Sequence, residues 1–98
     1  MNKTLFAISL AKKAGKLIYG HDQVRKETLS GKTFVIILAS DLSEKTASRV
    51  EFFAKDIVDI YKVKETQYEL ANIMGRLTGI LAITDENLAN LFIKSMID

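Results

Sequence analysis

The chain has 98 residues, 48% of them apolar, and a formal net charge of +2, values that fit one globular domain over residues 1–98 and exclude a disordered chain. The longest unbroken apolar run, residues 34–39, is too short to cross a bilayer, and no secretory signal precedes it, so we expect a cytoplasmic protein. The absence of cysteine excludes disulfides, thiolate nucleophiles and cysteine zinc sites.

Apolar spacing along the chain alternates between helical and extended patterns, which predicts an α/β fold. In chain order the predicted elements are a helix at 2–14, a strand at 17–19, a helix at 22–29, a strand at 33–39, a helix at 41–57, a strand at 59–63, a helix at 66–75, a strand at 79–84 and a helix at 85–96. Residues 33–39 are β-branched, aromatic or aliphatic without polar alternation, as in a strand covered on both faces, so we expect this strand in the centre of the sheet. The alternation also favours right-handed crossovers, with helices on both faces.

Capping residues predict where three of these helices begin. Asp22 follows a glycine turn and is a good N-cap. Asp41 stands three residues before Glu44, which resembles a capping box. Thr66 stands three residues before Glu69, which is a better capping box.

Few side chains are available for catalysis or metal binding. Nucleophilic catalysis needs a Ser or Thr beside a positioned base, and His21 is the only imidazole in the chain. Asp56 and Asp59 are the nearest approach to a metal site, and a solvated helix face explains them more simply. Neither glycine-rich phosphate-binding pattern occurs. We therefore expect no catalytic residue, no metal and no cofactor, and the chain is not expected to be an enzyme.

The basic residues gather in the N-terminal third. Residues 1–32 carry seven Lys or Arg against two acids, whereas residues 33–98 carry seven against ten. Lysines at the end of the first helix also stabilise the helix dipole, so part of this cluster has a purely structural explanation. The remaining excess indicates an anionic partner for this third of the chain.

The segment KLIYGHDQVRK, residues 16–26, combines several features of nucleic-acid binding. Amide groups at a helix N-terminus are donors for phosphate or base acceptors. Gln23 and Lys26 share an exposed helix face with Asp22, and both can contact purine edges or phosphate. An ordinary capped helix with an Asp22–Lys26 pair explains the same spacing, so the residues alone leave both interpretations open.

The stretch LAKKAGKLIYGHDQVRKETLSGKTFVIILASDLSEKT, residues 10–46, resembles the short bacterial, YlxQ-type members of the kink-turn-binding ribosomal protein superfamily, which also includes archaeal large-subunit and box C/D core proteins. The resemblance continues through LANIMG (70–75) and GILAITDENLANLF (79–92) and so covers nearly the whole chain. It implies a three-layer α-β-α sandwich around a mixed, roughly four-stranded sheet. It also implies RNA binding without catalysis.

The superfamily's RNA motif is a Gly, any residue, Asn, Glu, two further residues and Lys, where a loop enters the second helix. Gly20 and Lys26 match this motif, whereas Asp22 replaces the Asn and Gln23 replaces the Glu. Gln23 still accepts a hydrogen bond but lacks the charge that strengthens it, and Asp22 cannot donate as an amide does. The resemblance implies that Gly20 shapes the turn while Gln23 and Lys26 read purine edges.

The resemblance implies further contacts around this motif. Lys16 and Arg25 would bind phosphate. For His21 the residues alone leave two interpretations, an ordinary surface histidine before a helix or a ring that stacks on a base. An apolar loop after the fourth helix would cover a base turned out of the stack. In this chain the loop positions are Met74, Gly75 and Arg76.

We therefore expect a non-catalytic, monomeric protein that recognises kinked or bulged structured RNA, ribosomal RNA in particular, and binds neither DNA nor a membrane. The alternative is a protein-interaction module that has kept the fold and lost strong RNA binding, as Asp22, Gln23 and the acidic C-terminal part suggest. A small hydrolase is a third possibility, and it requires His21 to pair with a carboxylate in a closed pocket.

Overall fold

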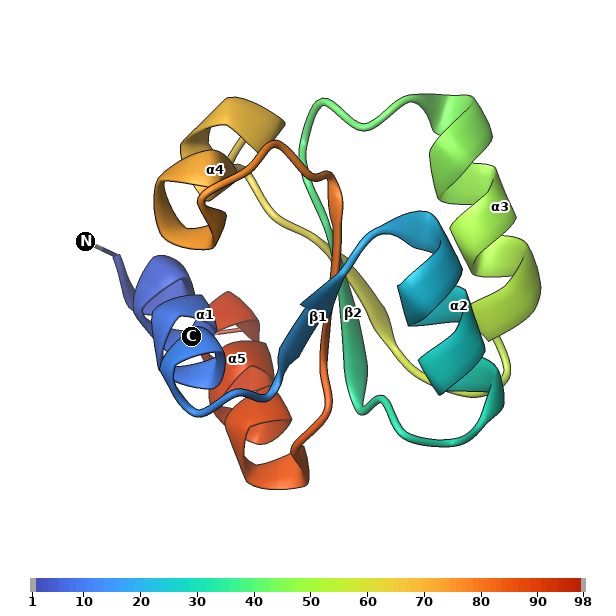
Figure 1. The fold of residues 1–98 in the computed structure, drawn as a ribbon, viewed down its shortest axis with the longest axis horizontal. Coiled ribbons are helices and arrows are strands. Elements are labelled where there is room, and N and C mark those ends of the chain that lie inside the picture. The colour runs from blue at the N-terminus through green and yellow to red at the C-terminus, as the bar shows by residue number, and fades with distance from the viewer. Residues whose placement is uncertain (1, 98) are drawn as a thin grey trace.

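Four strands form one mixed sheet between two layers of helices (Figure 1). The computed structural model describes residues 2–97. The helices are α1 (Lys3–Lys13), α2 (His21–Leu29), α3 (Glu44–Ala54), α4 (Gln67–Met74) and α5 (Glu86–Ile97), and the strands are β1 (Leu17–Tyr19), β2 (Val35–Leu38), β3 (Ile60–Lys62) and β4 (Ile80–Ile83). The expected three-layer α-β-α sandwich is confirmed.

The strand order in the sheet is β1-β4-β2-β3. β4 runs antiparallel to both of its neighbours, β1 and β2, whereas β2 and β3 are parallel. The two central strands, β2 and β4, are buried at every residue, as their continuous apolar sequences predict. The mixed sheet implied by the family resemblance is thus confirmed.

The side chains of β2 alternate between two hydrophobic cores, one on each face of the sheet. Val35 and Ile37 pack in the core with α1, α4 and α5, where Phe92 is a large, fully buried side chain. Ile36 and Leu38 pack in the core with α2 and α3. Figure 1 shows the same division, with α1, α4 and α5 to the left of the sheet and α2 and α3 to the right.

The predicted start of α2 is corrected by one backbone hydrogen bond. The N–H of Val24 donates to the carbonyl of Gly20, at 3.0 Å, so the first helical turn already includes His21. Gly20 is therefore the N-cap residue, and Asp22 lies within the first turn. As glycine has no side chain, α2 lacks a side-chain cap, whereas α1, α3 and α4 each have one in the described residues 2–97.

The other two predicted helix starts have different outcomes. α3 is capped by Ser43 rather than Asp41, and the Asp41 carboxylate instead accepts a hydrogen bond from the N–H of Gln67 in α4. Asp41 thus joins two elements that are distant in sequence. The Thr66–Glu69 capping box of α4 is confirmed, with both reciprocal hydrogen bonds present.

Candidate nucleic-acid interface

One edge of the sheet brings together the loops that precede α2 and α3 and the loop that follows α4. The N–H of Gly20 donates to the carbonyl of Ile80 at 3.0 Å, and the N–H of Ala39 donates to the carbonyl of Gly79 at 2.9 Å. The three loops lie in the upper half of Figure 1. Segments 60 and 40 residues apart in the sequence are thereby held side by side.

Gly20 sets the direction in which the chain enters α2. Its φ of +90° and ψ of 149° lie in a region that is essentially restricted to glycine. A Cβ added at this position would have no atom within 4 Å, so the backbone conformation, rather than a lack of space, requires glycine here. With no side-chain cap on this helix within residues 2–97, the N–H groups of its first turn remain available to a ligand.

The motif side chains of α2 are exposed. Asp22, Gln23 and Lys26 all face solvent, while Val24 and Thr28 of the same helix are buried. No ion pair joins Asp22 to Lys26 in the described part of the chain, and the contact of Asp22 is with His21. The Lys26 ammonium is therefore not neutralised by Asp22. The Asp22–Lys26 pair that the capped-helix interpretation assumed is absent from this part of the structure.

His21 packs between α2 and α3 rather than projecting into solvent. Its ring meets Phe53 edge to face, with centroids 5.7 Å apart, and its Nδ1 lies 3.4 Å from Asp22 Oδ1. The side chain of Asp22 is fully exposed, so this pair is open to water. The closed histidine–carboxylate pocket that a hydrolase would need is not present here.

The loop between α4 and β4 reaches the start of α2 through a cation–π contact. The Arg76 guanidinium carbon lies 4.8 Å from the centre of the Tyr19 ring, and Tyr19 immediately precedes Gly20. Gly75 ends α4 in the left-handed conformation, with φ +78°, so the chain turns into the loop that leads to β4. The structure thus places Gly75 and Arg76 beside the Gly20 segment.

Met74 occupies a different environment from the one the resemblance implies. It is 9% exposed and belongs to the core shared with α1 and α5, whereas Leu77 in the same loop is 67% exposed. The exposed apolar side chain of this loop is therefore that of Leu77 rather than Met74. Sequence reasoning missed Leu77 because an apolar residue after a helix end gives no signal of exposure.

Two of the predicted phosphate-binding residues lie away from this edge. Lys16 precedes β1, and its carbonyl accepts from the N–H of Thr84, so it lies at the opposite end of the strand from Gly20. Arg25 is exposed on the side of α2 that faces α3. Lys12 of the basic cluster donates to the carbonyl of Ile73, so it stabilises the end of α4.

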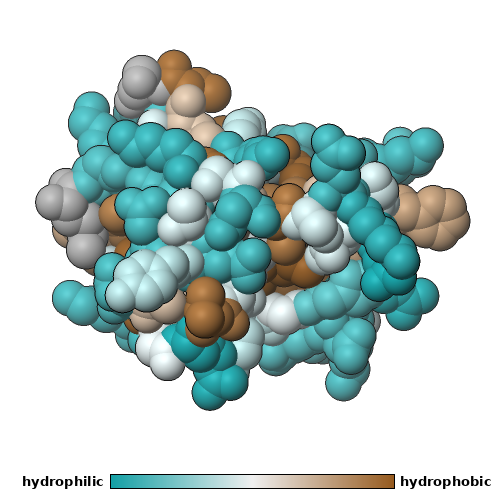
Figure 2. All heavy atoms as spheres, turned by 90° about the horizontal axis from the view of Figure 1, so that it is seen from above, coloured by the Kyte–Doolittle hydropathy of each residue, from teal (hydrophilic) through white to brown (hydrophobic). Residues whose placement is uncertain are grey.

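Figure 2 looks down on the edge formed by the three loops and shows apolar side chains between hydrophilic ones in the middle of this face.

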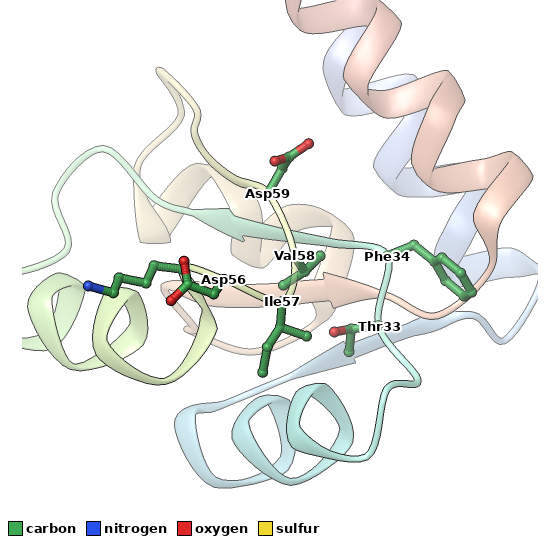
Figure 3. A pocket seen from close by; sticks show the side chains of 7 residues that line it. Thr33, Phe34, Asp56, Ile57, Val58 and Asp59 are labelled. Atoms are coloured by element: carbon green, nitrogen blue, oxygen red, sulfur yellow. The ribbon is translucent and has the colours of Figure 1, made fainter.

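At the opposite edge, where β2 and β3 begin, Thr33 and Phe34 border a hollow with residues 55–59 (Figure 3). Asp56 and Asp59 lie there in the loop after α3, and their carboxylates point in different directions. No group of three metal-ligating side chains occurs in residues 2–97, and no helix of these residues is long and apolar enough to span a membrane.

The chain is similar to known proteins over almost its entire length. The Ribosomal protein L7Ae/L30e/S12e/Gadd45 family matches residues 2–93. The RNA-binding protein YlxQ of Bacillus subtilis (strain 168) is 32% identical in an alignment of 92 positions that covers 89% of this chain and 88% of that protein.

Two solved structures share the fold. A protein of unknown function from Bacillus halodurans C superposes over 100% of both chains with a TM-score of 0.92 and 21% identity. The Giardia lamblia 15.5kD RNA binding protein superposes over 95% of this chain and 81% of its own with a TM-score of 0.80 and 15% identity. The family match and the identity to YlxQ together establish that this chain belongs to the Ribosomal protein L7Ae/L30e/S12e/Gadd45 family.

Proposed function

We propose that this chain is a non-catalytic RNA-binding protein that recognises a kinked or bulged structured RNA. Its family membership and its identity to an RNA-binding protein support the RNA-binding part. The observation that carries the proposal is the contact between Arg76 and Tyr19, since it joins the loop after α4 to the start of α2. One RNA segment can then meet both at the same time.

Each part of this edge has a chemical role in the proposal. The uncapped N–H groups of α2 donate hydrogen bonds to the RNA backbone, and Gly20 orients them. Gln23 and Lys26 are exposed side by side and contact purine edges, with Lys26 donating to guanine acceptors or to phosphate. Asp22 adds a negative charge close to the phosphates, which weakens binding relative to an asparagine.

The loop after α4 supplies an apolar cover for an unstacked base. Leu77 is exposed and suited to this role, Gly75 shapes the loop, and Met74 supports it from the core. Arg76 neutralises phosphate beside the edge. Arg25 does so further along α2, and Lys16 does so only if the RNA also follows β1 to its far end. The RNA is structured, ribosomal RNA in particular, and the protein acts as a cytoplasmic monomer.

The test is a binding titration of a standard kink-turn RNA beside an unkinked duplex of equal length, at several salt concentrations. We expect tighter binding of the kinked RNA. Lys26→Ala should cost about 1–3 kcal/mol if the side chain reads a base, or lower the salt slope by about one if it meets phosphate. Lys94→Ala, an exposed cation on α5 in the opposite helix layer, is the matched control and should change neither.

Two outcomes would contradict the proposal. Equal, weak and steeply salt-dependent binding of both RNAs would leave only non-specific attraction to the basic third of the chain. Equal effects of the Lys26 and Lys94 substitutions would remove Lys26 from the interface. The protein-interaction module on the same fold would then become the better explanation.

A further inference from the structure

A groove between α2 and α3 adjoins the proposed interface and shares only Arg25 with it. Its main lining residues are His21, Arg25 and Leu29 from α2 and Arg49, Phe52 and Phe53 from α3. His21 is the first residue of α2, so the groove begins where the motif segment enters the helix. A ligand bound along the proposed edge therefore continues into this groove without crossing another element.

The groove presents an aromatic ring that the protein leaves unpacked. Phe52 is 88% exposed, although Phe53 beside it is packed against His21 in the wall of the groove. Leu29 is also 50% exposed, so apolar surface lies on both sides. An exposed ring is a stacking surface for a base, and stacking accepts any base because every base has a π-face.

The charge of the groove favours an anionic occupant. Arg25 and Arg49 line it, and no acidic side chain does. The ion pair found within residues 2–97 is that of His21 with Asp22, so neither guanidinium is neutralised by a carboxylate there. Arginine guanidinium groups bind phosphate through two donors at once.

We propose that this groove binds an unpaired nucleotide of the same RNA, with its base stacked on Phe52 and its flanking phosphates held by Arg25 and Arg49. The inference rests on the proposed function, because it extends the RNA beyond the kinked element into a single-stranded flank. An acidic protein segment would also meet the two arginines, but the continuity with the proposed edge through His21 and Arg25 favours RNA.

The test compares a blunt kink-turn RNA with the same RNA carrying a six-nucleotide single-stranded overhang at each of its ends in turn. We expect at least one overhang to tighten binding by about fivefold or more, the lower limit for one base stacked on an aromatic ring. Phe52→Leu keeps the side chain apolar but removes the ring, so it should abolish this gain and leave the affinity for the blunt RNA unchanged. Phe52→Tyr should preserve the gain.

Matched controls come from the opposite helix layer. Phe6→Leu is the control for Phe52→Leu and changes a phenylalanine of α1 that is 54% exposed. Arg49→Gln removes one exposed charge from the groove, and its control, Lys94→Gln, removes one exposed charge from α5. Of these variants, only Phe52→Leu and Arg49→Gln should reduce the gain from the overhang. Circular dichroism and urea denaturation verify that all variants are folded.

The inference and the proposed function fail in different ways. Loss of preference for the kinked blunt RNA would overturn the proposed function, and the isolated six-nucleotide strand would then test the groove directly, with Phe52→Leu required to weaken its binding. No gain from any overhang, or a gain that Phe52→Leu preserves, would overturn the inference while the blunt RNA still binds. Tolerance of leucine would instead fit a protein segment as the occupant.

Discussion

The conformation of Gly20 makes Gly20→Ala the most informative single substitution. At φ +90° and ψ 149° an alanine is strained by about 1–3 kcal/mol, and no clash adds to this because a Cβ would meet nothing within 4 Å. Replacing glycine by alanine also lowers the conformational entropy of the unfolded chain, which offsets about 0.4–1 kcal/mol of this strain. We therefore expect a net loss of about 0.5–2 kcal/mol in the free energy of unfolding.

Urea denaturation followed by circular dichroism measures this loss, and in thermal unfolding each kcal/mol corresponds to roughly 4–8 °C in Tm for a domain of this size. Gly31→Ala is the matched control, since Gly31 also has positive φ, at +74°, and also has open space around its Cβ position. Both variants should lose stability, but only Gly20→Ala should weaken binding of the kink-turn RNA.

The difference in binding follows from the hydrogen bond between the Gly20 N–H and the Ile80 carbonyl. An alanine that relaxes to a negative φ rotates this peptide and moves the start of α2 away from the loop after α4. A Gly20→Ala protein with unchanged stability and unchanged RNA affinity would refute this reasoning, because the conformation would then have no consequence.

Three further predictions concern charge, burial and capping. Gln23→Glu should tighten kink-turn binding by roughly fivefold in a filter-binding assay, because a hydrogen bond to a charged acceptor contributes about 1 kcal/mol more than one to a neutral acceptor. Weaker binding would instead place Gln23 against phosphate. Met74→Ala should lower the free energy of unfolding by about 2–5 kcal/mol, whereas Leu77→Ala should lower it by less than about 0.5 kcal/mol and weaken RNA binding. Equal losses of stability in urea denaturation would contradict the assignment of Met74 to the core and Leu77 to the surface. Thr66→Ala should lower that free energy by about 1 kcal/mol with RNA affinity unchanged, since it removes a capping bond of α4, and an unchanged urea midpoint would argue against this.

Local sequence patterns determined the elements and their burial. The stretch at 33–39 predicted a central strand because its β-branched, aromatic and aliphatic residues do not alternate with polar ones, as in a strand covered on both faces. Thr66 and Glu69 predicted their capping box because both partners lie within one helical turn. Gly20 and Lys26 were identified through the family motif, and a glycine turn at that point was already evident from the sequence.

Only the tertiary structure decided which of these parts meet. Periodicity specifies the buried face of an element but not its neighbour, so the antiparallel placement of β4 beside β1 and β2 depends on packing across the sheet. The same packing brings Arg76 to Tyr19, buries Met74, exposes Leu77 and places Phe52 beside a groove. The sequence by itself determined the segment that carries the motif, and long-range packing determined the surface in which that segment lies, because contacts between distant residues are fixed only when all the layers are in place.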